Sequence, residues 1–226
     1  MIEHRQVLPL SSFNNVTVEK VSQILRKTPN KQCELDPMPT WLVKKLCDVL
    51  APIIRSMANA SFTQRLFLVS HKHAVVRPRS KKLSFDQLDI TSYRPISNLS
   101  LFSKTVERLV VNRMNLYLNQ YDLFPARQSA YRQHHSTETA VTIVHNDIVR
   151  STDAGFVSAL VLLDLSAVFD TVDHAILLEV LTERFGVENR ELDWFRSYHT
   201  RRNRLSQLQA AARLQLRLPV AFLKVR

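Results

Sequence analysis

At residues 159–174 the chain reads ALVLLDLSAVFDTVDH, an apolar run that ends at Asp164. A short run rich in Leu and Val is typical of a strand buried on both faces. The sequence therefore predicts a strand over residues 156–164, with Asp164 at the carboxyl end, where open sheets present chemistry to solvent. The carboxylate either holds a divalent cation for phosphoryl transfer or caps the turn that follows the strand.

The glycine content narrows the kinds of phosphate chemistry that remain open. The chain has only two glycines, Gly155 and Gly186. P-loop NTPases and dinucleotide-binding domains hold phosphates in glycine-rich loops, and neither motif can be written with two isolated glycines. The composition excludes both folds and leaves metal-assisted phosphoryl transfer without a glycine cradle.

Four stretches of the chain resemble, in the same order, the reverse transcriptases of non-LTR (LINE-type) retrotransposons. Residues 162–174 are similar to the first catalytic motif of that family. The other stretches are DPMPTWLVKK at 36–45, SYRPISNL at 92–99 and QSAYRQHHSTETA at 128–140. The resemblance runs from residue 16 to residue 203 and implies an α+β fold of the right-hand polymerase type, with a helix-rich N-terminal part, fingers and a partial palm.

The resemblance implies roles for three residues of the first catalytic motif. Asp164 corresponds to a metal-binding catalytic carboxylate, helped by the backbone carbonyl of Leu165. The implied cofactor is Mg²⁺, which prefers carboxylate and phosphate oxygens, and polymerase chemistry uses two such ions. Phe169 corresponds to the steric gate that excludes a ribose 2′-hydroxyl, and it is also expected to be a core aromatic. Asp170 and Asp173 are expected to be turn and cap residues.

Two cations correspond to residues that meet the incoming triphosphate in the family. Arg94 matches through SYRPISNL, and an Arg suits this role because its planar fork binds phosphate in a bidentate way. Lys82 matches through a stretch that departs from the usual pattern. Lys81 is equally well placed, and a solvated loop charge is the alternative for Lys82.

The stretch 128–140 resembles a segment that contacts template and primer, so Gln128 and Arg132 are candidate nucleic-acid contacts. The family usually has Gly where Ala130 stands; if that position requires a positive φ, Ala costs about 1 kcal/mol. His134 and His135 do not suggest a metal site, because adjacent histidines cannot face one ion at the start of a helix. The implied partners are an RNA or DNA template-primer and a dNTP.

Hydrophobic periodicity and capping residues predict the elements around these motifs. We expect helices over 16–28, after a cap at Thr40, with Pro52 in the first turn of the next helix, over 103–118, after a cap at Ser136, after a cap at Asp173 as far as Gly186, and over 188–198. Short strands are expected at 73–77 and 93–98, the second on a sheet edge because Pro95 lacks a backbone N–H. Phe169 should be buried together with one face of the helix after Asp173 (Ile176, Leu177, Val180 and Leu181).

The motifs and the elements suggest four regions. They are an N-terminal helical extension (1–35), a fingers-like region (36–155), a partial palm with the first catalytic motif (156–204) and an unrelated basic tail (205–226). No signal peptide or membrane-spanning run is visible, and two cysteines without a metal-binding spacing fit a reducing compartment. We therefore expect an intracellular protein, cytoplasmic or nuclear.

The net charge of +11 suggests a polyanionic partner. Most of it lies after Asp193, where eight basic residues and no acidic ones occur: Arg196, Arg201, Arg202, Arg204, Arg213, Arg217, Lys224 and Arg226. The excess positive charge is therefore a property of the C-terminal part more than of the rest of the chain. Weak, sequence-independent nucleic-acid binding by that part is one hypothesis.

The chain contains no Asp-Asp pair, although a complete polymerase of this type carries one on a later hairpin. We therefore expect a reverse transcriptase fragment without polymerase activity of its own. Two alternatives remain open: a catalytically dead nucleic-acid-binding module, and a non-functional remnant of a retroelement.

Overall fold

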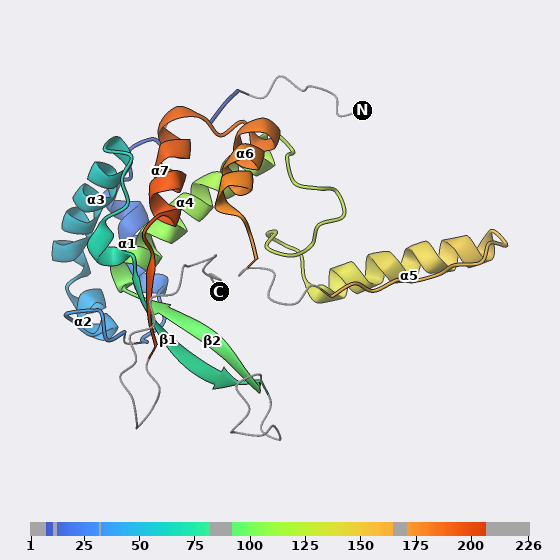
Figure 1. Cartoon of the computed structure of the whole chain (residues 1–226), viewed down its shortest axis with the longest axis horizontal. Coiled ribbons are helices and arrows are strands. Elements are labelled where there is room, and N and C mark those ends of the chain that lie inside the picture. The colour runs from blue at the N-terminus through green and yellow to red at the C-terminus, as the bar shows by residue number, and fades with distance from the viewer. Residues whose placement is uncertain (1–7, 11–12, 32, 82–91, 165–170, 207–226) are drawn as a thin grey trace. The chain divides into compact units, whose positions relative to one another are not determined.

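The computed structural model describes residues 8–10, 13–31, 33–81, 92–164 and 171–206. Contacts divide the chain into two units. Figure 1 labels the helices and strands and colours them by residue number. Unit 1 comprises residues 1–117 and 168–226, and unit 2 comprises residues 118–167. We describe the two units separately.

Unit 1 contains most of the helices and the only sheet of the described residues. Its helices are α1 (Val18–Lys27), α2 (Thr40–Lys45), α3 (Cys47–Thr63), η1 (Val69–His71), most of α4 (Leu101–Gln120), α6 (His174–Phe185) and α7 (Asn189–His199). Its strands are β1 (His73–Ser80), β2 (Tyr93–Leu99) and β3 (Asn203–Ser206). Helices combined with a small sheet agree with the predicted α+β class.

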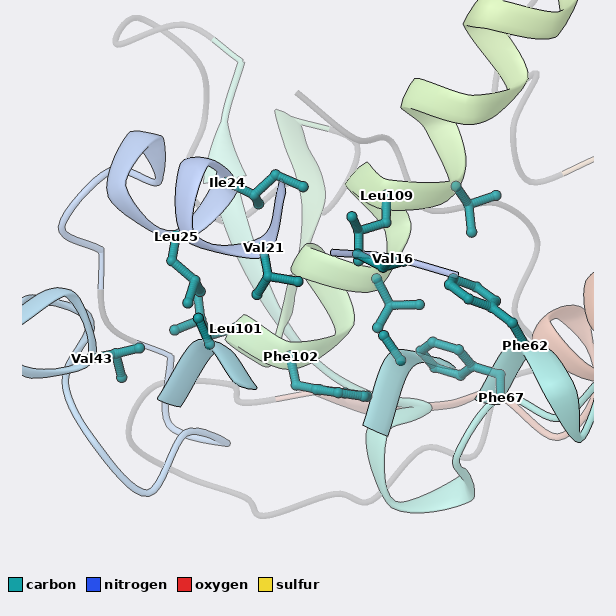
Figure 2. Packing of buried hydrophobic residues seen from close by; sticks show 14 of the residues in the cluster. Val16, Val21, Ile24, Leu25, Val43, Phe62, Phe67, Leu101, Phe102 and Leu109 are labelled. Atoms are coloured by element: carbon teal, nitrogen blue, oxygen red, sulfur yellow. The ribbon is translucent and has the colours of Figure 1, made fainter. Parts of the chain in front are cut away.

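The core of unit 1 lies among α1, α3, α4 and α7 (Figure 2). Helix α1 begins where the Thr17 hydroxyl accepts a hydrogen bond from the Lys20 backbone N–H, and it ends before Pro29. Its apolar face (Val21, Ile24, Leu25) is buried, as the periodicity predicted. From α7, Trp194 enters this cluster and donates its indole N–H to the Ser61 hydroxyl at 3.0 Å.

Two expectations for the next helices are wrong. Thr40 is the first residue of α2 and not its cap, because its hydroxyl donates to the Lys31 carbonyl at 2.7 Å. Helix α2 ends at Lys45, and α3 begins at Cys47, so Pro52 lies inside α3 and not in its first turn. The chain bends at Leu46, which allows a new helix to begin earlier than the proline signal indicated.

The sheet has the order β2-β1-β3, with β1 antiparallel to β2 and parallel to β3. Strand β2 therefore lies at an edge, as Pro95 predicted. Pro95 lies opposite Pro78 of β1. Strand β3 pairs only with residues 73–76 of β1, so Pro78 needs no backbone N–H on that side.

Unit 2 consists of a long loop, helix α5 (Thr137–Asp153) and the segment that follows it. Ser136 caps α5, as predicted, and forms a reciprocal capping box with Thr139. No residue in 118–164 is buried. The apolar face of α5 therefore has no core of its own within this unit.

The predicted buried strand at 156–164 is wrong. These residues form no regular strand, and the side chains of Leu162 and Leu163 are 83% and 86% exposed. A strand becomes stable and buried only when neighbouring strands satisfy its backbone groups. Within unit 2, the described residues contain no strand that could pair with this segment.

Helix α6 begins and ends where predicted, but its predicted burial is wrong. Asp173 accepts hydrogen bonds from the first-turn backbone N–H groups, and Gly186 ends the helix in the left-handed conformation at φ 63°. No residue of α6 is buried, and Ile176 is 59% exposed. The helix packs chiefly on α7, which covers only part of its apolar face. Phe169, the expected partner, lies outside the described residues.

Within the described ranges, no helix has the length and apolar character needed to cross a membrane.

Candidate functional site

The β1–β2 hairpin of unit 1 places Arg79 directly opposite Arg94. Side chains directly opposite in an antiparallel pair share one face, and like charges there destabilise the sheet. Arg77 lies on the same face, two residues before Arg79. An anion bound by the two opposed guanidinium groups would remove their repulsion.

Arg77 is neutralised by an ion pair with Glu34. By contrast, Arg79 and Arg94 are exposed and form no ion pair with any acidic residue that the structure describes. Lys81 is also exposed, and its backbone N–H bonds the Ser92 carbonyl at 2.9 Å, which continues the hairpin. The free end of the hairpin is therefore a cluster of three cations, which we call the hairpin cation cluster (Arg79, Lys81 and Arg94).

Arg79 was not singled out by the sequence, because one strand does not reveal its partner in the next. The pairing of Pro78 with Pro95 sets the register that brings Arg79 opposite Arg94. Lys82, the other predicted triphosphate contact, lies outside the described residues, so its role stays a prediction.

The other end of the hairpin is anchored to α7 and α4. Lys72 precedes β1, and its buried ammonium group donates to the carbonyls of Ser197 at 2.5 Å and Thr200 at 3.2 Å. Burial, together with the nearby Arg202 and Arg201, lowers the pKa of Lys72. These carbonyls lie at the C-terminal end of α7, where the helix dipole favours a cation.

Arg202 precedes β3 and belongs to a second buried contact. Its guanidinium lies 3.4 Å from the Glu107 carboxylate and 3.8 Å from the centre of the Tyr198 ring. The Tyr198 hydroxyl donates to the same carboxylate at 2.5 Å. Burial raises the pKa of Glu107, while Arg202 and Tyr198 oppose that rise.

Asp164 belongs to unit 2, where it is exposed at the end of the segment 156–164. Leu165 and Phe169 lie outside the described residues. Asp173 caps the start of α6, as expected. The metal-binding and gate roles of the first motif therefore stay predictions.

The loop before α5 holds Gln128 and Arg132. The Gln128 side-chain amide donates to the Ala130 carbonyl at 3.0 Å, and the Arg132 guanidinium lies 5.5 Å from the Phe124 ring centre. The positive φ values in this loop fall at Asp122 (52°), Tyr131 (60°) and His134 (62°) and not at Ala130. Ala130 therefore does not carry the backbone cost considered for it.

A divalent metal ion needs several ligands in one place. Across the ranges given above, no group of three or more His, Cys, Asp or Glu residues could hold a metal ion. His134, His135 and Glu138 line an open depression at the start of α5, without forming such a group. Asp164 is a suitable oxygen ligand for Mg²⁺ but supplies a single carboxylate.

The sequence of the chain matches one family model and several known proteins. The family model described as "Reverse transcriptase (RNA-dependent DNA polymerase)" matches residues 80–218, past the boundary expected at 205. The chain is 36% identical over 94 residues (42% of the chain) to "Probable RNA-directed DNA polymerase from transposon BS" of Drosophila melanogaster, covering 10% of that relative. It is 27% identical over 172 residues (76% of the chain) to "RNA-directed DNA polymerase from mobile element jockey" of the same species, covering 18%. The corresponding Drosophila funebris protein is 26% identical over 168 residues (72% of the chain), with 18% covered.

Proposed function

Because the chain belongs to the reverse transcriptase (RNA-dependent DNA polymerase) family, as a domain of the non-LTR (LINE-type) kind, we propose that it contributes the nucleotide-binding part of an RNA-directed DNA polymerase. The chain spans between a tenth and a fifth of the length of the curated relatives that it matches. Template-primer and dNTP are its proposed partners.

The hairpin cation cluster carries this proposal. Arg94 lies within the stretch that resembles the family's triphosphate contact, and Arg79 lies opposite it without an acidic partner in the described chain. Guanidinium groups bind phosphate oxygens through charge-assisted, bidentate hydrogen bonds. The proposed ligand is therefore the triphosphate of a dNTP, with Lys82 as a further contact.

The proposed catalytic part is the first motif. Asp164 and the backbone carbonyl of Leu165 would hold Mg²⁺, which when bound would stabilise the charge on the phosphate oxygens. Phe169 is the proposed steric gate against a 2′-hydroxyl. Gln128 and Arg132 are the proposed contacts to template and primer. Residues 36–155 are proposed as fingers, and residues 156–204 as a partial palm.

Binding of a fluorescent dNTP analogue to the chain tests the nucleotide proposal. A charge-assisted hydrogen bond contributes about 1.5–3 kcal/mol, so Arg94→Ala and Arg79→Ala should each weaken binding roughly 10- to 100-fold. Arg77→Ala is the matched control, because its charge lies on the same face but is already paired with Glu34. Equal losses in all three variants would show nonspecific attraction to positive charge and would overturn the proposal.

The isolated chain should not catalyse templated DNA synthesis. This chemistry needs two metal ions held together. In the first motif, the resemblance assigns only one carboxylate as a metal ligand, that of Asp164. Primer extension with magnesium or manganese is the measurement. Incorporation of dNTP that Asp164→Ala abolishes would show that the chain assembles a two-metal site by itself.

A second candidate function is nucleic-acid binding without catalysis. It is favoured by the eight basic residues and the absence of acidic ones after Asp193. Such a charge distribution attracts phosphate backbones without reading sequence. The salt dependence of binding, discussed below, separates this candidate from a remnant without function.

A further inference from the structure

Residues 13–16 cross unit 1 between α3, α4 and α7, and we call them the N-terminal strap. At its end, the Val16 backbone N–H donates to the Asn59 side-chain oxygen at 2.7 Å. The Asn59 side-chain N–H₂ in turn donates to the Val16 carbonyl at 3.2 Å. Upstream, Leu10 exchanges two backbone hydrogen bonds with the segment between α6 and α7, at 2.9 Å to Gly186 and 3.1 Å from Glu188.

The ring of Phe13 holds the strap against the core. Its centre lies 5.1 Å from that of Phe62 and 6.1 Å from that of Trp194, in edge-to-face contact with the indole. The Arg113 guanidinium of α4 lies 5.3 Å from the Phe13 ring centre, and it also donates to the Asn14 carbonyl. Aromatic and cation–π contacts of this kind each contribute modestly, so the strap is held by a small number of interactions.

Two charged groups beside the strap are buried without full hydrogen bonding. Glu191, in the first turn of α7, is 1% exposed, and neither carboxylate oxygen accepts a well-aligned hydrogen bond from the described part of the chain, although the backbone N–H groups of Glu191 and Phe13 lie close to it. One terminal nitrogen of Arg113, Nη1, is likewise buried without a partner there. Buried charges in this state are costly, and they would recover hydration if the strap moved away.

We propose that the N-terminal strap is a releasable clamp, whose opening hydrates Glu191 and Arg113 and frees the N-terminal end of α7. The contacts of Phe13 and Val16 favour the closed state, and the poorly satisfied charges favour the open state. The far end of α7 is held independently, by Lys72 and by the Glu107–Tyr198 contact. Opening is therefore a local event that leaves the rest of unit 1 folded.

The clamp should open as the pH rises. Burial raises the pKa of Glu191 in the closed state, while the backbone N–H groups of Glu191 and Phe13, together with Arg190 of α7 and Arg113 of α4, oppose the rise. In the open state the pKa of Glu191 returns to its ordinary range. Between the open-state and closed-state pKa of Glu191, the ratio of open to closed chains rises by up to about tenfold per pH unit. The reason is that Glu191 releases its proton more easily in the open state. Burial lowers the pKa of Arg113 to about 10, so Arg113 stays charged throughout this interval.

Trp194 provides a direct readout, because its ring touches Phe13 and the chain has only one other tryptophan, the exposed Trp41. In a Trp41→Phe background, acrylamide quenching of Trp194 should increase with pH and then level off. Glu191→Gln should remove this pH dependence and keep quenching low. Phe13→Ala should give high quenching at every pH. Glu188→Gln is the matched control, since that carboxylate forms no cap hydrogen bond at the start of α7 and should leave the pH dependence unchanged.

Far-UV circular dichroism separates opening of the strap from unfolding. Quenching that is independent of pH and unchanged by Phe13→Ala, with the helical signal intact, would overturn the proposal. If Phe13→Ala loses the helical signal, the proposal is tested by amide hydrogen exchange in the Trp41→Phe chain, which keeps Phe13. The Val16 amide should exchange faster than the Val110 amide in the middle of α4, and equal protection would overturn the proposal.

Discussion

At the scale of single residues, Lys72 and Arg202 stand immediately before β1 and β3, and both are buried. Only one carboxylate, that of Glu107, lies within ion-pairing distance of either in the described chain. Lys72 relies on backbone carbonyls instead. The parallel pairing of β1 with β3 therefore starts from two buried cations with specific partners, so losing a partner should be costly.

Removing Glu107 should strongly destabilise unit 1. Glu107→Ala leaves Arg202 buried without a counter-charge and deprives the Tyr198 hydroxyl of its acceptor, so we expect a loss of about 3–5 kcal/mol in the free energy of unfolding. Arg26→Ala removes an exposed pair with Asp48 and should cost less than about 1 kcal/mol. Urea unfolding of both variants measures the difference. Equal losses would mean that the Glu107–Arg202 pair is not formed as described.

His199 should make stability depend on pH. Burial, with His174 and Arg202 nearby, lowers its pKa to about 3 in the folded chain. The unfolded chain binds this proton near the ordinary value of about 6.5. The stability that the neutral form contributes is therefore present above that pH and is lost as the pH falls toward 3.

Replacement of His199 by Leu should remove this contribution. The free energy of unfolding should then depend less steeply on pH below about 6.5. The control is His145→Gln, because His145 is exposed on α5 and should leave the slope unchanged. Urea unfolding at several pH values gives both slopes. A slope in His199→Leu as steep as in the original chain would contradict the prediction.

At the scale of elements, the helices of unit 1 and the segment 156–164 of unit 2 differ in what covers them. The apolar face of α1 is buried against α3 and α4, whereas Val157 is 99% exposed. The segment 156–163 carries no charge and no proline. An exposed apolar segment with unpaired backbone groups favours pairing with another chain.

We therefore expect the isolated chain to self-associate through this segment. Leu162→Lys should shift the mass measured by analytical ultracentrifugation toward the monomer at 26.1 kDa, because a buried lysine opposes strand pairing. Leu116→Lys, at a comparably exposed leucine on α4, should not shift it. Equal effects of the two substitutions would indicate general hydrophobic association and not pairing of this segment.

At the scale of the whole molecule, charge is distributed unevenly along the chain. Eight of the basic residues follow Asp193, and four of them lie beyond Ser206, the last residue of β3. A cut after Ser206 therefore removes half of this charge and leaves the pairing of β3 with β1 complete. A cut after residue 204 would also remove two residues that pair with β1.

Deleting residues 207–226 should weaken RNA or DNA binding and reduce its salt dependence. Each neutralised phosphate contributes about 0.7–0.9 to the slope of log affinity against log salt, so losing four cations should lower the slope by up to about 3.6. Arg94→Ala should barely change the slope, because that residue is expected to meet a triphosphate. Unchanged affinity and slope after the deletion would remove the main support for the nucleic-acid-binding candidate.

The sequence by itself determined the features that depend on neighbouring residues. Asp173 and Gly186 mark the ends of α6, Ser136 starts α5, and Pro95 places β2 at an edge, because caps and prolines act through the backbone within a few residues. The family was also readable from sequence, because its motifs are short, ordered stretches.

Tertiary structure alone decided the features that depend on partners far along the chain. The apolar pattern at 156–164 predicted burial, but unit 2 contains no described strand to pair with it, and among the described elements α7 covers only part of the apolar face of α6. Arg79 became a candidate only when strand register set it opposite Arg94. The buried roles of Arg202 and Glu191 were equally invisible, because burial and ion pairing are set by which distant segments meet and not by local propensity.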